Sequence, residues 1–171
     1  LLSMREPMVI HSITLSNAAD KPSYAQVKSG NDAAGAKNTS GKLITIEGEN
    51  PTRTSSQMLY PIQDQSSPSV SPSSPKMLLN NTIGGNSWRL VGQWIEWDFD
   101  VEESGYYNIS LYDSQNFVRG IYVSRKITID GEVPFKELEA YGFKYDQSWR
   151  EDVLQDAGGT PYSFYLEAGH H

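Results

Sequence analysis

Residues 88–131 contain three runs in which apolar and polar side chains alternate with a period of two, and this alternation constrains the fold more than any other feature. In the run 94–101, apolar side chains share one face and acidic ones the other: Ile95, Trp97, Phe99 and Val101 against Glu96, Asp98 and Asp100. The runs 105–112 and 120–130 repeat the pattern. Such alternation is typical of antiparallel strands with one face on a core and one in water. We therefore expect Trp97 to lie in the core.

Turn signals between the runs support the same architecture. Asp130-Gly131, Glu103-Ser104-Gly105 and Gly158-Gly159 combine residues that favour tight turns. Further strands are predicted at 42–49, near 140–146 and at 161–166. Short strands separated by turns roughly every 10 to 15 residues are typical of a β-sandwich, so the predicted fold class is all-β.

The chain is predicted to divide near residue 41. Residues 1–41 are expected to form an N-terminal strand at 8–16 and a polar linker at 17–41, and residues 42–171 one sandwich module. The segment 63–76 holds six Ser and three Pro, which predicts a surface excursion between strands; the alternative is a domain boundary. Because the last predicted strand has no partner after it, the module is expected to be truncated at its C-terminus, or completed by the strand at 8–16.

Composition argues against several classes of function. The 171-residue chain has a net charge of −7 and no cysteine, so neither nucleic-acid binding nor a disulfide framework is expected. No apolar run has the length of a membrane span, so direct membrane insertion is not expected. The chain has no nucleophile elbow, HExxH motif or glycine-rich phosphate loop. The acids at 98–103 lie on an outward strand face and the adjoining turn, which argues against a glycosidase pair.

The order of several short motifs resembles a known family. The chain carries IEGE, GQWIEWDF, SGYYNISLY and ITIDGEVPF in that order. This order is similar to that of galactose-binding-like jelly rolls, with carbohydrate-binding module families six and thirty-five as the nearest groups. The NNTIGG motif, with IDGEVPF and PYSFYLEAGHH, further resembles jelly-roll modules fused to extracellular solute-binding proteins of Gram-positive sugar ABC transporters. The resemblance covers about residues 42–171.

The resemblance implies a jelly-roll β-sandwich that binds carbohydrate without catalysis, through loops at one end. It also implies an extracellular, cell-surface location within a larger protein, whose flanking domains are partners. In this family a ligand segment follows the second of the three runs, and here it reads Asp113 to Arg119. The candidate ligand residues offer aromatic planes and polar groups to an oligo- or polysaccharide: Trp88, Trp94, Tyr112, Gln115, Asn116, Arg119, Arg125 and Trp149.

Each candidate also has a structural interpretation. Trp88 could plug the core, Trp94 could pack beneath a loop, and the loop amides could simply build a turn. Arg125 lies among apolar neighbours, where pairing with an acid such as Glu132 competes evenly with a ligand role. Burial of Trp88, Trp94 and Trp149 together would favour the alternative function, a structural or interaction module of a cell-surface protein with no ligand of its own.

A structural calcium ion is a further implication of the resemblance. Such modules commonly hold it with carboxylates on their first strand, and Glu47 and Glu49 match that position. Alternation in 42–49 places both carboxylates on one face, and carboxylates suit a hard cation. In the family, a further strand supplies the remaining ligands, and that strand is not evident at the end of this chain. An alternative of equal weight to the calcium site is that Glu47 and Glu49 are two solvated acids on the surface. The terminal His170 and His171 are assigned no function.

Overall fold

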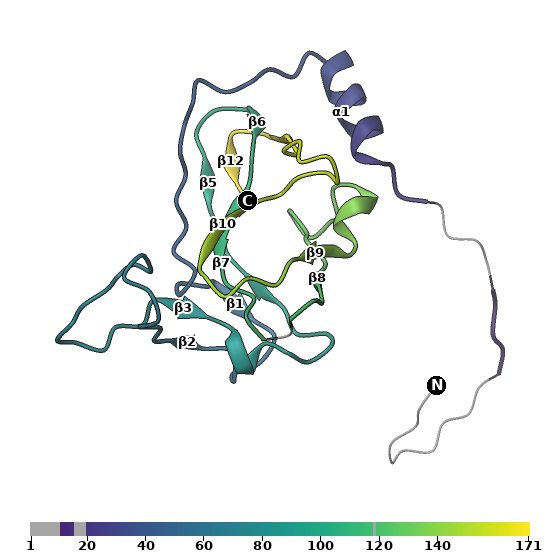
Figure 1. Ribbon diagram of the computed structural model, residues 1–171. Coiled ribbons are helices and arrows are strands. Elements are labelled where there is room, and N and C mark those ends of the chain that lie inside the picture. The colour runs from purple at the N-terminus through teal and green to yellow at the C-terminus, as the bar shows by residue number, and fades with distance from the viewer. Residues whose placement is uncertain (1–10, 16–19, 118) are drawn as a thin grey trace.

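The computed structural model describes residues 11–15, 20–117 and 119–171. Short strands dominate this part of the chain, with one α-helix and two 3-10 helices (Figure 1). The elements are, in order, α1 (Tyr24–Ala33), β1 (Arg53–Thr54), β2 (Pro61–Ile62), β3 (Thr82–Ile83), η1 (Gly85–Ser87), β4 (Ile95–Glu96), β5 (Asp100–Val101), β6 (Gly105–Tyr107), β7 (Ser110–Asp113), β8 (Val123–Arg125), η2 (Lys136–Leu138), β9 (Tyr141–Phe143), β10 (Arg150–Val153), β11 (Phe164–Leu166) and β12 (Gly169–His170). Within these residues no helix combines the length and apolar character that crossing a membrane requires.

All the strand pairs in the described residues are antiparallel and two-stranded: β1–β4, β2–β3, β5–β12, β6–β11, β7–β10 and β8–β9. The pair β7–β10 is the longest, and in its register Asp113 faces Arg150 while Ser110 faces Val153. Small antiparallel sheets with few helices agree with the predicted all-β class.

The core is built from the C-terminal part of the chain. Its buried members are Phe135, Leu138, Phe143, Leu154, Tyr162 and Phe164. Phe135 lies at the centre of this cluster, with its ring centroid 4.9 Å from that of Tyr162 and 5.6 Å from that of Phe164. Leu138 and Leu154 have no exposed surface. Most of this core therefore lies outside the three alternating runs on which the fold prediction rests.

The run 94–101 is less regular than its alternation predicts. It forms β4 and β5, and residues 97–99 between them belong to no strand. Trp97 is half-buried, so its predicted place in the core is wrong. The reason is a polar contact near the surface, because its indole Nε1 donates to the Gly48 carbonyl oxygen at 3.0 Å. On that apolar face only Val101 is buried.

Helix α1 is a correction to the linker predicted at 17–41. Ser23 caps the helix, since its hydroxyl accepts the Gln26 N–H at 3.4 Å and the Gln26 side chain accepts the Ser23 N–H at 2.8 Å. Tyr24 then packs on the core, with ring centroids 5.1 Å from Phe135 and 4.7 Å from Tyr162. Of the strand predicted at 8–16, residues 11–15 are described and belong to no strand; the others lie outside the described residues.

The strand predicted at 42–49 is also wrong, since these residues form no strand. None of these residues is buried, and Leu43 is 89% exposed, so no apolar face packs against a core. Residues 47–50 turn instead, with the Asn50 N–H donating to the Glu47 carbonyl oxygen at 3.0 Å.

At the other end of the chain, β12 pairs with β5, and the backbones of His171 and Phe99 exchange two hydrogen bonds of 2.8 and 2.9 Å. The C-terminal residues thus pair with β5 rather than with residues 11–15.

The serine-rich residues 63–76 lie in a long excursion between the paired strands β2 and β3 (Figure 1). We call residues 63–81 the serine arm. Within the arm, Val70 is only 2% exposed, and the Asn81 amide nitrogen donates to the carbonyl oxygens of Asp64 and Pro72 at 2.9 and 3.1 Å. These hydrogen bonds hold the end of the arm to its beginning and to its middle.

Candidate functional site

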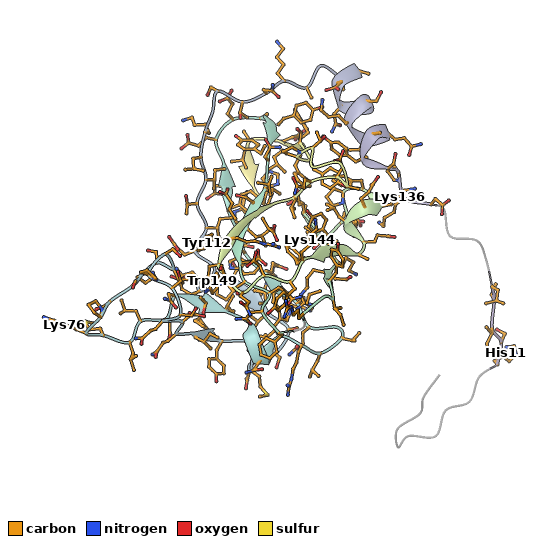
Figure 2. All side chains as sticks on the ribbon, viewed as in Figure 1. His11, Lys76, Tyr112, Lys136, Lys144 and Trp149 are labelled. Atoms are coloured by element: carbon orange, nitrogen blue, oxygen red, sulfur yellow. The ribbon has the colours of Figure 1, made fainter. Side chains whose placement is uncertain are left out.

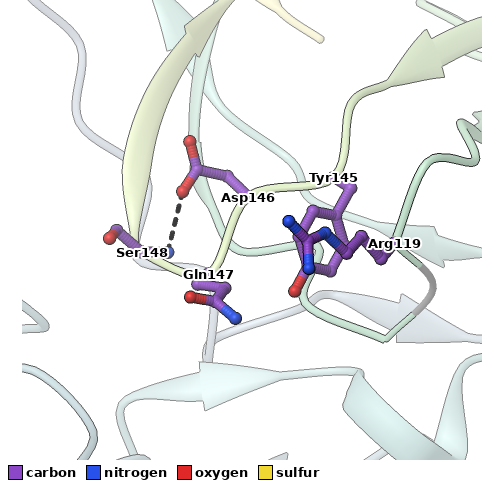
Figure 3. Close-up of a pocket in the computed structure, with 5 residues that line it drawn as sticks. All are labelled: Arg119, Tyr145, Asp146, Gln147 and Ser148. Carbon is purple, nitrogen blue, oxygen red and sulfur yellow. Dashed lines mark hydrogen bonds between the residues drawn. The ribbon is translucent and has the colours of Figure 1, made fainter.

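A pocket of about 410 Å³ lies where the loop after β7 meets the loop before β10. Arg119 lines it from the first loop, and four consecutive polar residues line it from the second: Tyr145, Asp146, Gln147 and Ser148 (Figure 3). The residues around this open cavity thus carry hydroxyl, carboxylate, amide and guanidinium groups. Groups of these kinds are the ones that hydrogen-bond vicinal hydroxyls.

Gln115 joins the two loops. The Asp146 N–H donates to the Gln115 carbonyl oxygen at 2.9 Å. The Gln115 side chain is buried, and its amide donates to the Ile121 carbonyl oxygen at 3.0 Å while accepting the Phe117 N–H at 3.1 Å. Its role in this structure is to shape the turn, which was the structural interpretation of this residue.

Asp146 is held in place from both sides. One carboxylate oxygen accepts the Ser148 N–H at 2.9 Å, which closes a local turn (Figure 3). The other oxygen lies 3.5 Å from Nη1 of Arg150. Among the residues that line this pocket, Asp146 is the single carboxylate. A pair of acids facing each other across the cavity, which a glycosidase requires, is therefore not found among its lining residues.

An aromatic pair adjoins the pocket residues in the sequence, since Trp149 directly follows Ser148, but neither ring lines the pocket. The rings of Tyr112 and Trp149 stack with centroids 5.8 Å apart and planes 23° apart. Figure 2 labels the two residues close to each other. The serine arm holds both polar tips: the Tyr112 hydroxyl donates to Oγ of Ser69 at 2.6 Å, and the Trp149 indole donates to Oγ of Ser66 at 3.2 Å. Tyr112 is 48% exposed and Trp149 is half-buried. The aromatic pair therefore offers partly accessible apolar surface.

Three carboxylates surround Arg150 next to this pair. Its guanidinium donates to Asp152 at 2.6 Å and lies near Asp146, while Asp113 faces it across the β7–β10 ladder. Burial, followed by the charge of Asp152, raises the pKa of Asp113 to about 6. Its Oδ1 is buried and has no hydrogen-bond partner among the described residues.

Trp88 and Arg125 form a separate pair away from this pocket. The Arg125 guanidinium carbon lies 4.3 Å from the Trp88 ring centroid, and its Nη2 donates to the Trp88 carbonyl oxygen at 3.1 Å. Burial lowers the pKa of Arg125. Neither residue lines the pocket of Arg119, so the arginine pair considered for an acidic sugar is not assembled there.

The remaining candidates are more dispersed. Trp94 is 47% exposed, and Asn116 is exposed, but neither lines the pocket of Arg119. None of the tryptophans at 88, 94 and 149 is buried, so the condition that favours a purely structural module is not met. Glu47 is exposed and Glu49 half-buried. Residues 11–15, 20–117 and 119–171 contain no group of three acidic, histidine or cysteine side chains that could hold a metal ion, so the calcium site stays a prediction.

The sequence interpretation missed the residues at 145–148 that make most of the pocket. They lie in the irregular stretch 135–157, where only a strand near 140–146 was predicted, and β10 was missed. The available signal was the polar run between Phe143 and Trp149. Comparisons with protein-family models, curated proteins and solved structures found no match to this chain.

Proposed function

We propose that this chain is a non-catalytic module that binds an oligo- or polysaccharide at the pocket of Arg119 and residues 145–148. The observation that supports this proposal most strongly is the stacked Tyr112–Trp149 pair, in which Trp149 directly follows the pocket residues 145–148. Sugars present hydroxyls on their edges and C–H groups on their faces. Polar groups beside an aromatic face suit both surfaces at once.

The finer features of the proposal rest on the motif resemblance. On this account the chain is a jelly-roll module at the outer surface of the cell, within a larger solute-binding protein of a sugar ABC transporter. Its task there is to hold glycans near the flanking domains. The pocket is open and the contact area is small, so we expect weak binding of a single sugar unit and stronger binding of longer chains.

A structural or interaction module is the second candidate, and one observation favours it. The polar tips of Tyr112 and Trp149 already hydrogen-bond to Ser69 and Ser66 of the same chain. If these bonds only fasten the serine arm, the aromatic pair is part of the scaffold and needs no ligand.

A glycan array followed by calorimetry on the whole chain distinguishes the two candidates. Each titration is run with calcium and with a chelator, because the predicted ion would act through Glu47 and Glu49. Carbohydrate binding predicts a saturable signal for at least one neutral or acidic glycan. Absence of binding to every glycan, under both conditions, would leave the interaction module as the better account.

A further inference from the structure

A second cavity, of about 320 Å³, lies between helix α1, the turn at 129–135 and strand β11. Much of its lining is apolar: Val27, Ile129, Pro134, Phe135, Phe164 and Leu166. Asn31, Asp130, Glu132, Glu167 and His171 add polar groups to the same cavity. Its volume is within the range of small-molecule and side-chain pockets.

The way α1 is attached explains why this cavity is present. Near its first turn, the Tyr24 hydroxyl accepts the Ser163 N–H at 3.0 Å, and the Tyr24 N–H donates to Glu137 at 3.0 Å. Near its last turn, Asp32 accepts the Tyr106 hydroxyl at 2.8 Å. Val27 and Asn31 lie between these attachments, one helical turn apart, and both border the cavity. Helix α1 therefore borders the cavity on one side, and its side chains leave the volume open.

The charges in the cavity are predominantly negative. Nδ1 of His171 lies 2.9 Å from Asp130, and Nε2 of His171 lies 2.8 Å from the Glu167 carbonyl oxygen. Lys21 lies 3.9 Å from Glu132, at the edge of the range for an ion pair. The Glu167 carboxylate makes no hydrogen bond within the described residues, and its charge adds to the hydrogen bond at the Glu167 backbone in raising the pKa of His171. Three carboxylates thus meet one histidine and one distant lysine, in a chain whose net charge is −7.

We propose that this cavity binds a lysine or arginine side chain presented by a partner polypeptide. The apolar walls accept the methylene stem, which carries most of the buried area. The carboxylates of Glu132 and Glu167 accept the cationic head, which remains near water at the cavity mouth. A neutral alkyl chain gains only the apolar contact with the walls, and an anionic ligand is repelled by the carboxylates. This site is separate from the pocket of Arg119 and does not depend on the carbohydrate proposal.

The test uses three small probes on the whole chain, followed by NMR amide shifts and calorimetry. The probes are the blocked amino acids N-acetyl-lysine methylamide, N-acetyl-arginine methylamide and N-acetyl-norleucine methylamide. We expect a cationic probe to shift the amides of Val27, Asn31 and Leu166 at millimolar concentration, and the norleucine probe to bind about tenfold more weakly. Raising the salt concentration should weaken binding of the cationic probes, because the charges at the mouth are exposed to screening.

Charge-neutral variants complete the design. Glu167→Gln should weaken binding of the cationic probes about threefold or more without changing that of norleucine. Glu139→Gln removes one charge from an exposed position outside the cavity and serves as the matched control. Equal binding of norleucine and the cationic probes, an equal effect of both variants, or shifts confined to residues elsewhere would each overturn the proposal.

Discussion

Tyr112 and Trp149 stack on each other at a centroid distance of 5.8 Å while donating hydrogen bonds to two different serines of the serine arm. Tyr112 lies in β7, one residue before its end, and Trp149 immediately precedes β10, so the stack forms at the Asp113–Arg150 end of the longest strand pair. Segments far apart in the sequence are thereby joined at the proposed binding face. The aromatic pair holds the serine arm, and under the proposed function it also contacts the ligand, so experiment can separate the two roles.

Replacing Ser66 and Ser69 by alanine should release the tips of the aromatic pair. We expect the Trp149 indole N–H signal to shift in the NMR spectrum, because its acceptor is removed. If a glycan uses the same tips, its affinity should rise about fivefold or more, since the two lost bonds together contribute roughly 1–3 kcal/mol. Ser73→Ala, which removes a hydroxyl elsewhere in the arm, is the matched control. An unchanged indole signal in the double variant would contradict the observed contact.

Asp113 should make the folded state less stable as the pH rises. Its pKa is about 6 in the folded protein and 3.8 ordinarily, so between pH 4 and 6 the folded state binds more protons than the unfolded state. Stability therefore falls across that window, and the loss is complete above it. Asp113→Asn should stabilise the protein at pH 7.5 by on the order of 1 kcal/mol, allowing for solvent screening, and have little effect near pH 4.

Urea unfolding of the wild type and of Asp113→Asn at both pH values measures this difference. Glu151→Gln removes a charge from an exposed position of β10 and controls for the change in net charge. A stabilisation by Asp113→Asn that is equal at pH 4 and pH 7.5 would show that the carboxyl does not titrate in this window.

Leu154 should be essential to the core because it has no exposed surface and packs in the cluster around Phe135. Leu154→Ala leaves a cavity, and we expect it to lower the free energy of unfolding by about 2–5 kcal/mol. Leu90→Ala, at a position that is mostly exposed, should change it by less than about 0.5 kcal/mol. Chemical denaturation gives both values, and similar effects of the two variants would place the core elsewhere.

Ser23 should stabilise α1 through its capping box. Ser23→Ala is expected to cost about 0.5–2 kcal/mol and to speed hydrogen exchange of the amides in Tyr24–Ala33. Ser29→Ala, an exposed substitution within the same helix, should leave or slightly raise the protection of these amides. Unchanged exchange in Ser23→Ala would mean that the contacts of Tyr24 hold the helix without the cap.

The sequence predicted those elements whose stability is local. The turn at Asp130-Gly131 is present, with Asp130 at φ 53° and a bridge between Ile129 and Glu132 on either side. The alternation in 105–112 likewise corresponds to β6 and β7, which pair antiparallel with β11 and β10. In these segments the side-chain pattern and the backbone hydrogen bonds require the same conformation.

The elements that were missed depend on tertiary contacts. Strand β10 reads Arg-Glu-Asp-Val, and its charged residues Arg150 and Asp152 pair with each other instead of facing water, so no apolar alternation marks it. Helix α1 has no buried residue and a mostly polar sequence, and its packing depends on Tyr24 contacting residues more than a hundred positions away. Pocket residues 145–148 lie in the loop that leads into β10, so they were missed together with that strand.

The most direct test of carbohydrate binding compares two tryptophans in one calorimetric titration with the glycan that binds best. Trp149→Ala should reduce the affinity about tenfold or more, because its ring supplies the apolar face beside the pocket. Trp94→Ala removes a more exposed indole that lines neither cavity and should leave the affinity unchanged. Equal affinity of the wild type and Trp149→Ala, with both folded, would contradict the proposed site.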